Sequence, residues 1–143
     1  MNQRLPPRNR RAFVDSGAYF ALLDRRDQHH ADAVAIARRI ARDRYRQFTT
    51  NSVIIESHAL MLNHLGRPQA AQFLRDISDG NTVIVRMQER DEERAKEIIF
   101  HFVDKDYSFT DALSFVAMEQ LGITEAFAFD RHFIQYGFHR LTP

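Results

Sequence analysis

Hydrophobic and polar residues along this chain fall into two alternating patterns. Short runs that are apolar on both faces predict strands at 11–15, 47–50, 82–86, 125–129 and 138–142. Segments whose apolar residues recur every three or four positions predict helices at 16–24, 30–46, 51–65, 67–78, 89–102 and 109–121. Because strands and helices alternate, we predict a layered α/β domain with a mainly parallel central sheet.

Polar residues and glycines mark the ends of the predicted helices. We expect Asn51 or Ser52 to cap the helix that follows, and we expect Gly66 and Gly122 to end the helices before them. In a parallel sheet, sites form outside the carboxyl ends of the strands, near the point where the strand order reverses. Functional residues are therefore expected directly after the strands.

Composition limits the classes of protein to consider. The 143 residues fit one domain, which we place at 11–143 behind a flexible Arg/Pro-rich leader at 1–10. The chain has no cysteine, which excludes disulfides and thiolate metal sites and is typical of a reducing, cytoplasmic setting. No apolar run approaches the roughly 18 residues of a membrane span. A net charge of +1 is too small to indicate nucleic acid binding, so such binding must rest on a site.

Three aspartates lie at the ends of predicted elements. Asp15 and Asp130 each follow a strand, so their carboxylates converge if those strands are neighbours, and Asp111 opens the helix between them. Each also has a purely structural interpretation. Asp15 could cap a helix, Asp111 could form a capping box with Ser108, and Asp130 could begin a turn.

Glu56 is harder to explain structurally. Apolar side chains point in nearly every direction around the helix over 51–65, so we predict that this helix is mostly buried. An isolated carboxylate there would be costly without partners. The alternative is a salt bridge, or an edge position that faces solvent.

Together, Asp15, Glu56, Asp111 and Asp130 suggest a pocket of oxygen ligands. Two carboxylates about 5 Å apart repel each other by roughly 3 kcal/mol at an effective dielectric constant of about 20. Four of them together require a cation, and hard oxygen ligands favour Mg²⁺ or Mn²⁺ over Zn²⁺. Such ions activate water and stabilise charge on a phosphodiester.

At these residues the chain resembles the PIN-domain ribonucleases, especially VapC-type toxins. The successive motifs that carry the resemblance are "FVDSGAYFALLDRRDQHHADA", "TTNSVIIES", "YSFTDALSFVAMEQLGI" and "AFAFDRHF". They span about 11–142 in the expected order, and the pair Thr110-Asp111 with the later Asp130 is the most specific part.

The resemblance implies both a fold and an activity. Family members form a three-layer α/β/α sandwich and are Mg²⁺- or Mn²⁺-dependent RNA endonucleases. Matched residue by residue, the resemblance places the catalytic and metal-binding acids at Asp15, Glu56, Asp111 and Asp130, none of which is replaced. It further implies the toxin of a type II toxin–antitoxin pair, with a protein antitoxin as partner and a homodimer as the assembly.

Further residues are expected near the substrate. Ser16 matches a small hydroxyl residue that often follows the first acid in the family, and Thr110 precedes another acid. Arg38 and Arg42 belong to the arginine-rich run "RRIARDRYR", whose default interpretation is a solvated helix face. The alternatives are contact with RNA phosphates, for which Arg38 and Arg42 are the candidates, and a surface for an acidic partner. We expect His132 to have a structural role.

Three other classes of protein fit the pattern less well. A phosphoreceiver domain needs an acidic pair after the first strand, where Ser16 and Gly17 follow Asp15. A haloacid-dehalogenase-type phosphatase needs a second aspartate at the position of Gly17. A catalytically weak RNA- or protein-binding module of the same fold stays open, and only an activity assay distinguishes it.

Overall fold

A single parallel sheet forms the centre of the computed structural model, which describes residues 10–143. Its strand order is β3-β2-β1-β4-β5, and every pairing within it is parallel. The strands are β1 (Arg11–Val14), β2 (Arg46–Thr50), β3 (Val83–Val85), β4 (Glu125–Phe127) and β5 (His139–Arg140). The predicted leader at 1–10 lies outside the described residues apart from Arg10, whose carbonyl accepts a hydrogen bond of 2.8 Å from the Arg46 amide.

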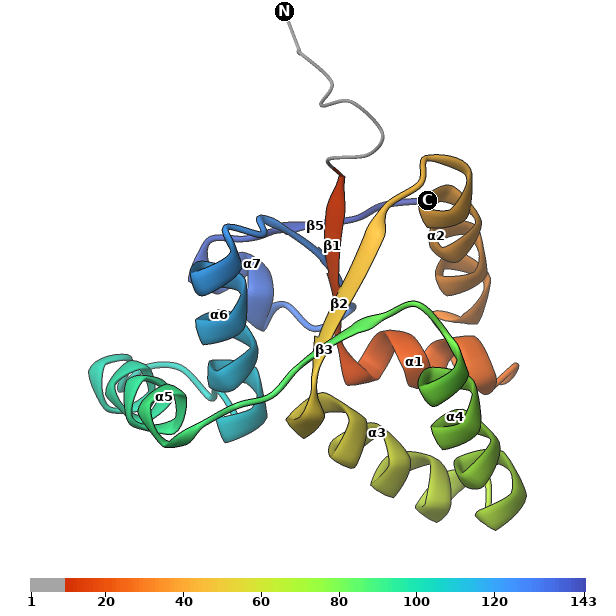
Figure 1. Ribbon diagram of the computed structural model, residues 1–143, viewed down its shortest axis with the longest axis horizontal. Helices are drawn as coiled ribbons and strands as arrows, with labels where there is room; N and C mark the ends of the chain where they lie inside the picture. Colours follow the sequence, from red (N-terminus) through yellow and green to blue (C-terminus); the bar gives the residue numbers. More distant parts are fainter. Residues whose placement is uncertain (1–9) are drawn as a thin grey trace, which may run out of the picture.

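Helices cover both faces of this sheet, which gives the predicted three-layer α/β/α sandwich (Figure 1). On one side α1 packs against α2 and α3, and α3 packs against α4; on the other side α6 packs against α5 and α7. The helices are α1 (Ser16–Leu23), α2 (His30–Arg42), α3 (Asn51–His64), α4 (Arg67–Asp79), α5 (Glu89–His101), α6 (Phe109–Leu121) and α7 (His132–Tyr136). None of these helices is long and apolar enough to cross a membrane.

The order of the strands creates a switch point beside β1. The chain runs from β1 outward to β2 and β3, then returns to place β4 on the other side of β1. Residues that follow β1 and β4 therefore lie at one edge of the sheet, where parallel α/β proteins form their sites. Asp15 and Asp130 indeed follow neighbouring strands.

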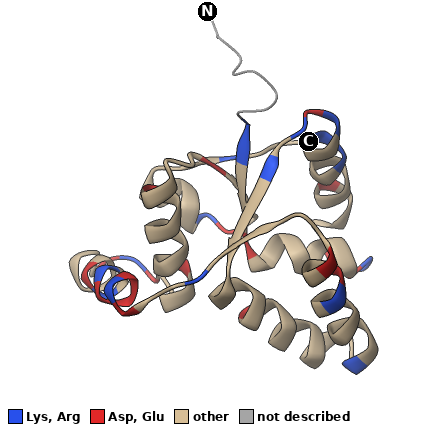
Figure 2. Cartoon of the chain, in the orientation of Figure 1, with Lys and Arg blue, Asp and Glu red and all other residues tan. Residues whose placement is uncertain are grey.

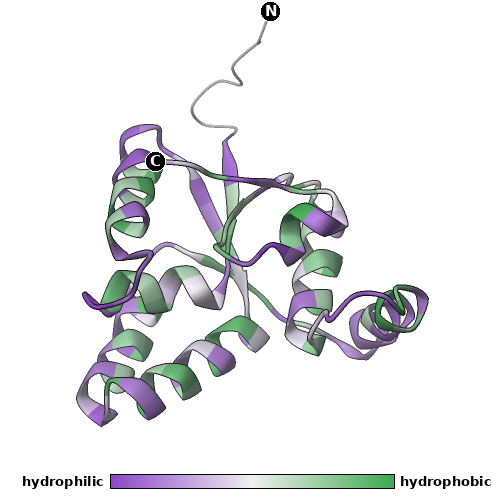
Figure 3. Cartoon of the chain, turned by 180° about the vertical axis from the view of Figure 1, so that it is seen from behind, coloured by the Kyte–Doolittle hydropathy of each residue, from purple (hydrophilic) through white to green (hydrophobic). Residues whose placement is uncertain are grey.

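Aromatic packing fixes the elements around this edge. Phe13 of β1, Phe115 of α6 and Phe133 of α7 are fully buried, with ring centroids 6.1 Å apart for Phe13–Phe133 and 5.2 Å apart for Phe115–Phe133. β1 and β4 each begin with a hydrophilic residue and continue with apolar ones (Figure 3). The core thus joins α6 and α7 to β1, and it positions the residues that precede or follow them.

Two features of α3 differ from the prediction. Its N-cap is Thr50, whose Oγ1 accepts a hydrogen bond of 3.1 Å from the Val53 amide, so neither Asn51 nor Ser52 is the cap. Asn51 instead accepts a hydrogen bond of 3.0 Å from the Met87 amide and ties the start of α3 to the segment after β3.

The prediction that α3 is mostly buried was also wrong. The helix buries one face, formed by Val53, Ser57 and Met61, whereas Ile55 is 68% exposed and Leu62 is 46% exposed. Apolar residues that point in all directions do not require burial in all directions. Glu56 therefore lies half-buried on a helix with a solvent-facing side.

Other boundaries moved for local reasons. The helix predicted at 30–46 ends at Arg42, because Arg44 takes a positive φ of 55° and β2 begins at once. The helix α7, a single turn, was not predicted because it is too short to show a period. Gly122 ends α6 in the left-handed conformation with φ 65°, as expected.

Replacing the cap tests the start of α3. Thr50→Val keeps the shape of a fully buried side chain but removes its oxygen, so it should lower the free energy of unfolding by about 1 kcal/mol in urea titrations. Ser52→Ala is the matched control and should change that free energy by less than about 0.5 kcal/mol. A larger loss in Ser52→Ala than in Thr50→Val would restore Ser52 as the cap.

Candidate active site

Asp15 is held by the backbone at the junction of β1 and α1. Its amide donates a hydrogen bond of 3.0 Å to the Phe127 carbonyl of β4, and its own carbonyl accepts from the amides of Ala18 and Tyr19. The side chain is 4% exposed. Within residues 10–143 it makes no capping hydrogen bond, and its Oδ1 has no hydrogen-bond partner. Asp15 therefore occupies the N-cap position of α1 but does not cap the helix with its side chain.

Asp111 is both a structural and a site residue. Its Oδ2 accepts a hydrogen bond of 3.1 Å from the Ser108 amide, and its own amide donates one of 3.0 Å to Ser108 Oγ. This is the capping box that the sequence allowed. Asp111 nevertheless reaches the acidic edge, because α6 begins there and Asp111 itself is buried in the first turn.

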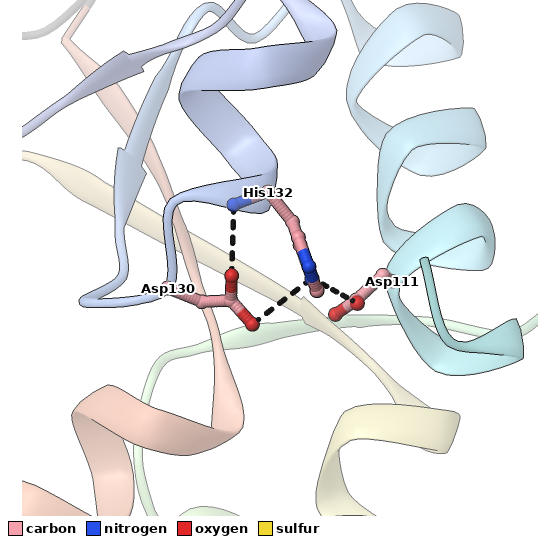
Figure 4. A group of neighbouring side chains, drawn as sticks. All are labelled: Asp111, Asp130 and His132. Carbon is pink, nitrogen blue, oxygen red and sulfur yellow. Dashed lines mark hydrogen bonds and ion pairs between the residues drawn. The ribbon is translucent and has the colours of Figure 1, made fainter. Parts of the chain in front are cut away.

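Asp130 lies three residues beyond the end of β4 and faces Asp111 (Figure 4). Its Oδ1 accepts a hydrogen bond of 2.8 Å from the His132 amide, which forms the expected turn. His132 lies between the two acids, with its Nδ1 2.9 Å from Asp111 Oδ2 and 3.1 Å from Asp130 Oδ2. Ligand atoms of these three residues all lie within 4.8 Å of one another.

Glu56 reaches the same region from α3. Ser16, the residue after Asp15, donates a hydrogen bond of 2.5 Å from its Oγ to Glu56 Oε1. Ser16 is buried, so this contact orients the carboxylate from the start of α1. The salt bridge offered as an alternative for Glu56 is not found among the described residues.

Burial and the neighbouring acids change the pKa of Asp15. Burial first, and then repulsion from Asp111, raises the pKa of the Asp15 carboxyl to about 7. Glu56 and Asp130 raise this pKa further, and the Ser16 amide opposes the rise. The Asp15 carboxylate thus experiences the field of the three other acids, which places all four in the same region of the molecule.

The cluster fits a divalent cation. Asp15 presents a buried oxygen that lacks a partner in the described chain, and a bound cation would satisfy it. The donors are carboxylate oxygens, which suit hard ions of the Mg²⁺ and Mn²⁺ type. Such an ion would also remove the repulsion that raises the pKa of Asp15.

The other predicted substrate-binding residues lie on both sides of the molecule: Thr110 is near the four acids, and Arg38 and Arg42 are far from them. Thr110, half-buried in the first turn of α6, is next to Asp111 and accepts a hydrogen bond of 2.9 Å at its carbonyl from Ser114 Oγ. Arg38 and Arg42 are exposed on the last turns of α2, which lead into the start of β2. They therefore lie toward the amino-terminal edge of the sheet, opposite the acids, where Figure 2 shows basic residues at the start of β1 and β2.

His132 is the site residue whose position the sequence did not reveal. A lone histidine after an aspartate has no spacing that predicts a contact with Asp111, since the two lie on different helices. The available sequence signal was Phe133, the aromatic residue that follows His132. It is fully buried in the structure and therefore turns this segment toward the core.

Three comparisons relate the chain to known proteins. The sequence profile of the PIN domain matches residues 12–139. A VapC ribonuclease of Archaeoglobus fulgidus is 32% identical over 113 residues, which cover 77% of this chain and 71% of the relative. The 23S rRNA-specific endonuclease VapC20 of Mycobacterium tuberculosis is 33% identical over 132 residues, which cover 92% of this chain and 98% of the relative.

The fold is shared as well. The crystal structure of Mycobacterium tuberculosis VapC20, a toxin that cleaves the Sarcin-Ricin loop, superposes with a TM-score of 0.84 at 28% identity. The superposition covers 92% of this chain and 99% of that chain. The likeness therefore extends over nearly the whole length of both chains.

The raised pKa of Asp15 predicts how pH changes stability without metal. Because the folded-state value of about 7 exceeds the ordinary value of 3.8, the folded protein binds this proton more tightly than the unfolded chain does. The resulting stabilisation is complete below about pH 4 and is lost as pH rises to about 7, a change on the order of 4 kcal/mol. We expect Asp15→Asn to remove this dependence.

Urea unfolding in EDTA at pH 5 and pH 8 measures the effect. The wild type should lose stability relative to Asp15→Asn between the two values, whereas Asp79→Asn, on the exposed end of α4, should follow the wild type. An equal difference between wild type and Asp15→Asn at both pH values would contradict the electrostatic account of the cluster.

Proposed function

Because the chain belongs to the PIN-domain family, we propose that it is an endoribonuclease that hydrolyses RNA phosphodiester bonds with Mg²⁺ or Mn²⁺ and acts as the toxin of a toxin–antitoxin pair. The observation that carries the proposal is the Asp15 carboxylate, buried in the field of three other acids at the switch point of the sheet. Buried aspartates and glutamates with a purely structural role are normally paired with basic side chains or accept hydrogen bonds from backbone amides. This arrangement is instead suited to bind a cation.

In the proposed mechanism, Asp15, Glu56, Asp111 and Asp130 hold the cation. When bound, a divalent ion supplies a Lewis acid that offsets charge on the phosphodiester and lowers the pKa of water. Without it, four carboxylates would repel a phosphate, so substrate binding at this edge depends on the ion. Ser16 fixes the orientation of Glu56 through its 2.5 Å hydrogen bond and lies close to any substrate that reaches Asp15.

The relatives suggest which RNA to test first. VapC20 of Mycobacterium tuberculosis is named for cleavage of 23S rRNA, and it aligns with this chain over almost its whole length. We therefore propose 23S rRNA as the first candidate substrate. Thr110, beside Asp111 at the start of α6, is placed to contact it.

We also propose that Arg38 and Arg42 contact phosphates at a distance from the cleaved bond. At 1.5 Å per residue, Arg42 lies roughly 18 Å along α2 from its start at His30. Arg42 is 71% exposed at its side chain, although it pairs with Asp43 at 3.1 Å. An RNA that fills the acidic edge would have to pass around the sheet to reach these side chains.

Protein partners complete the proposal. A nuclease acting on RNA in the cytoplasm must be restrained, which is the reason for proposing an antitoxin. An antitoxin helix could pack on the apolar residues of α1 that are accessible at the surface. Leu23 at the end of α1 is 37% exposed and is available for such a contact, whereas Tyr19 is buried and belongs to the core of the domain. Exposed Phe100 and Val103, at the end of α5 and just beyond it, support a further protein interface, and we propose a homodimer.

The alternative is a catalytically weak binding module of the same fold. Such a module has no need to retain a buried acidic cluster that destabilises the metal-free protein. The four acids, all placed at one edge, therefore favour the enzyme. The next experiment separates the two possibilities.

Loss of one acid should abolish cleavage. Purified wild type should cut 23S rRNA with Mg²⁺ or Mn²⁺ and stop cutting in EDTA. Asp15→Asn should be slower by about 100-fold or more, since several kcal/mol of charge stabilisation depend on the ion. Cleavage rates on denaturing gels measure the effect, and Asp79→Asn should cleave at the wild-type rate.

Expression in cells provides the matching test of the toxin role. Wild type should stop growth, Asp15→Asn should not, and a small adjacent gene should restore growth. Equal growth with wild type and Asp15→Asn, together with no cleavage in vitro, would favour the binding module.

Salt dependence tests the arginines. In the Asp15→Asn background, Arg38→Ala/Arg42→Ala should reduce the slope of log binding constant against log salt by about 0.7 for each phosphate that the two arginines neutralise. Arg67→Ala/Arg75→Ala removes the same charge from the exposed side of α4 and should leave the slope nearly unchanged. Equal slopes for the two double variants would return Arg38 and Arg42 to a solvated face.

A further inference from the structure

His132 contacts the acidic cluster through two different groups. Its backbone amide donates to Asp130 Oδ1 at 2.8 Å. Its ring Nδ1 lies 3.1 Å from the other oxygen of the same carboxylate and 2.9 Å from Asp111 Oδ2 (Figure 4). One residue therefore touches both oxygens of Asp130 and bridges two acids that lie on separate elements.

The His132 imidazole contacts both carboxylates through one nitrogen, Nδ1. Nδ1 lies within hydrogen-bond distance of both carboxylates, so the tautomer with its hydrogen on Nδ1 donates to Asp111 and Asp130. Both contacts to Asp111 from Ser108 and His132 fall on Oδ2. They therefore leave the orientation of Asp111 fixed without occupying its Oδ1.

The imidazole is itself held in place. Phe133, which follows it, is fully buried against Phe13 and Phe115. On the other side, the Tyr107 ring meets the imidazole edge to face, with centroids 5.4 Å apart. Tyr107 in turn packs on Phe115 at 5.1 Å. The position of the Nδ1 donor is thus determined by the aromatic core.

We propose that His132 is a positioning residue, which donates from Nδ1 to Asp111 and Asp130 and holds the two carboxylates in the arrangement that binds the divalent cation. The inference rests on the proposed metal-dependent function. Ligating carboxylates in metal sites are oriented by such donors, and removal of one weakens metal binding or activity by about 10- to 100-fold. His132 acts through the acids and has no direct contact with the cation.

Three substitutions separate the donor from the bulk of the ring. The amide nitrogen of asparagine lies close to the place of Nδ1, whereas that of glutamine lies closer to the place of Nε2. His132→Ala should raise the dissociation constant for Mn²⁺, measured by electron paramagnetic resonance, by about 10- to 100-fold. His132→Asn should recover most of that affinity and His132→Gln should not, and the rate of RNA cleavage at limiting Mn²⁺ should follow the same order.

Two spectroscopic readouts do not depend on activity. In the metal-free protein, nitrogen NMR should show the His132 ring protonated at Nδ1. With Mn²⁺ bound, pulsed electron paramagnetic resonance should show the same nitrogen couplings in the wild type and in His132→Ala, because the His132 ring does not bind the ion. A nitrogen coupling that is present in the wild type and absent from His132→Ala would make His132 a direct ligand and overturn the proposal.

The remaining outcomes distinguish the inference from the function on which it rests. If the wild type binds and cleaves normally while His132→Ala binds Mn²⁺ equally well, the inference alone is wrong. Equal weakening in His132→Asn and His132→Gln would also overturn it, and this comparison holds even if His132→Ala fails to fold. If the wild type neither binds Mn²⁺ nor cleaves RNA, the proposed function fails and the inference fails with it.

Discussion

The Asp15 carboxylate is buried close to three other acids. Burial and repulsion both oppose ionisation of Asp15, and together they raise its pKa to about 7. A chain selected for stability alone would place an apolar or capped residue there. The fold tolerates the cluster because its aromatic core, around Phe13, Phe115 and Phe133, supplies stabilising contacts close to the acids.

The topology explains how acids so far apart in the sequence reach one edge. Each comes from a different segment: Asp15 follows β1, Glu56 lies within α3, Asp111 lies at the start of α6 and Asp130 follows β4. The strand order places β2 and β4 on either side of β1, so that the segments after all three strands converge. Local hydrogen bonds then adjust each carboxylate, as Ser16 does for Glu56 and Ser108 does for Asp111.

Sequence reasoning could predict those parts of the site that depend on strand ends, because the carboxyl ends of parallel strands have a common edge. It predicted in this way that Asp15 and Asp130 follow strands, which are neighbours in the sheet, and it predicted the capping box as one role of Asp111. It failed where the outcome depends on three-dimensional packing. The exposed face of α3, the cap at Thr50 and the bridging contact of His132 follow from how elements pack, and no period or spacing encodes them.

The distribution of charged residues explains why the net charge gave no indication of RNA binding. A net charge of +1 conceals a cluster of basic residues at the start of β1 and β2, at the edge of the sheet opposite the four acids (Figure 2). At that opposite edge Arg10, Arg39 and Arg42 all approach the single carboxylate of Asp43. A hollow of about 600 Å³ nearby is lined by Arg44, Tyr45, Arg46, Gln47, Asn81 and Thr82. Local potential, and not net charge, governs how a polyanion approaches, so a near-neutral chain of this shape is compatible with a substrate that carries a phosphate at every nucleotide.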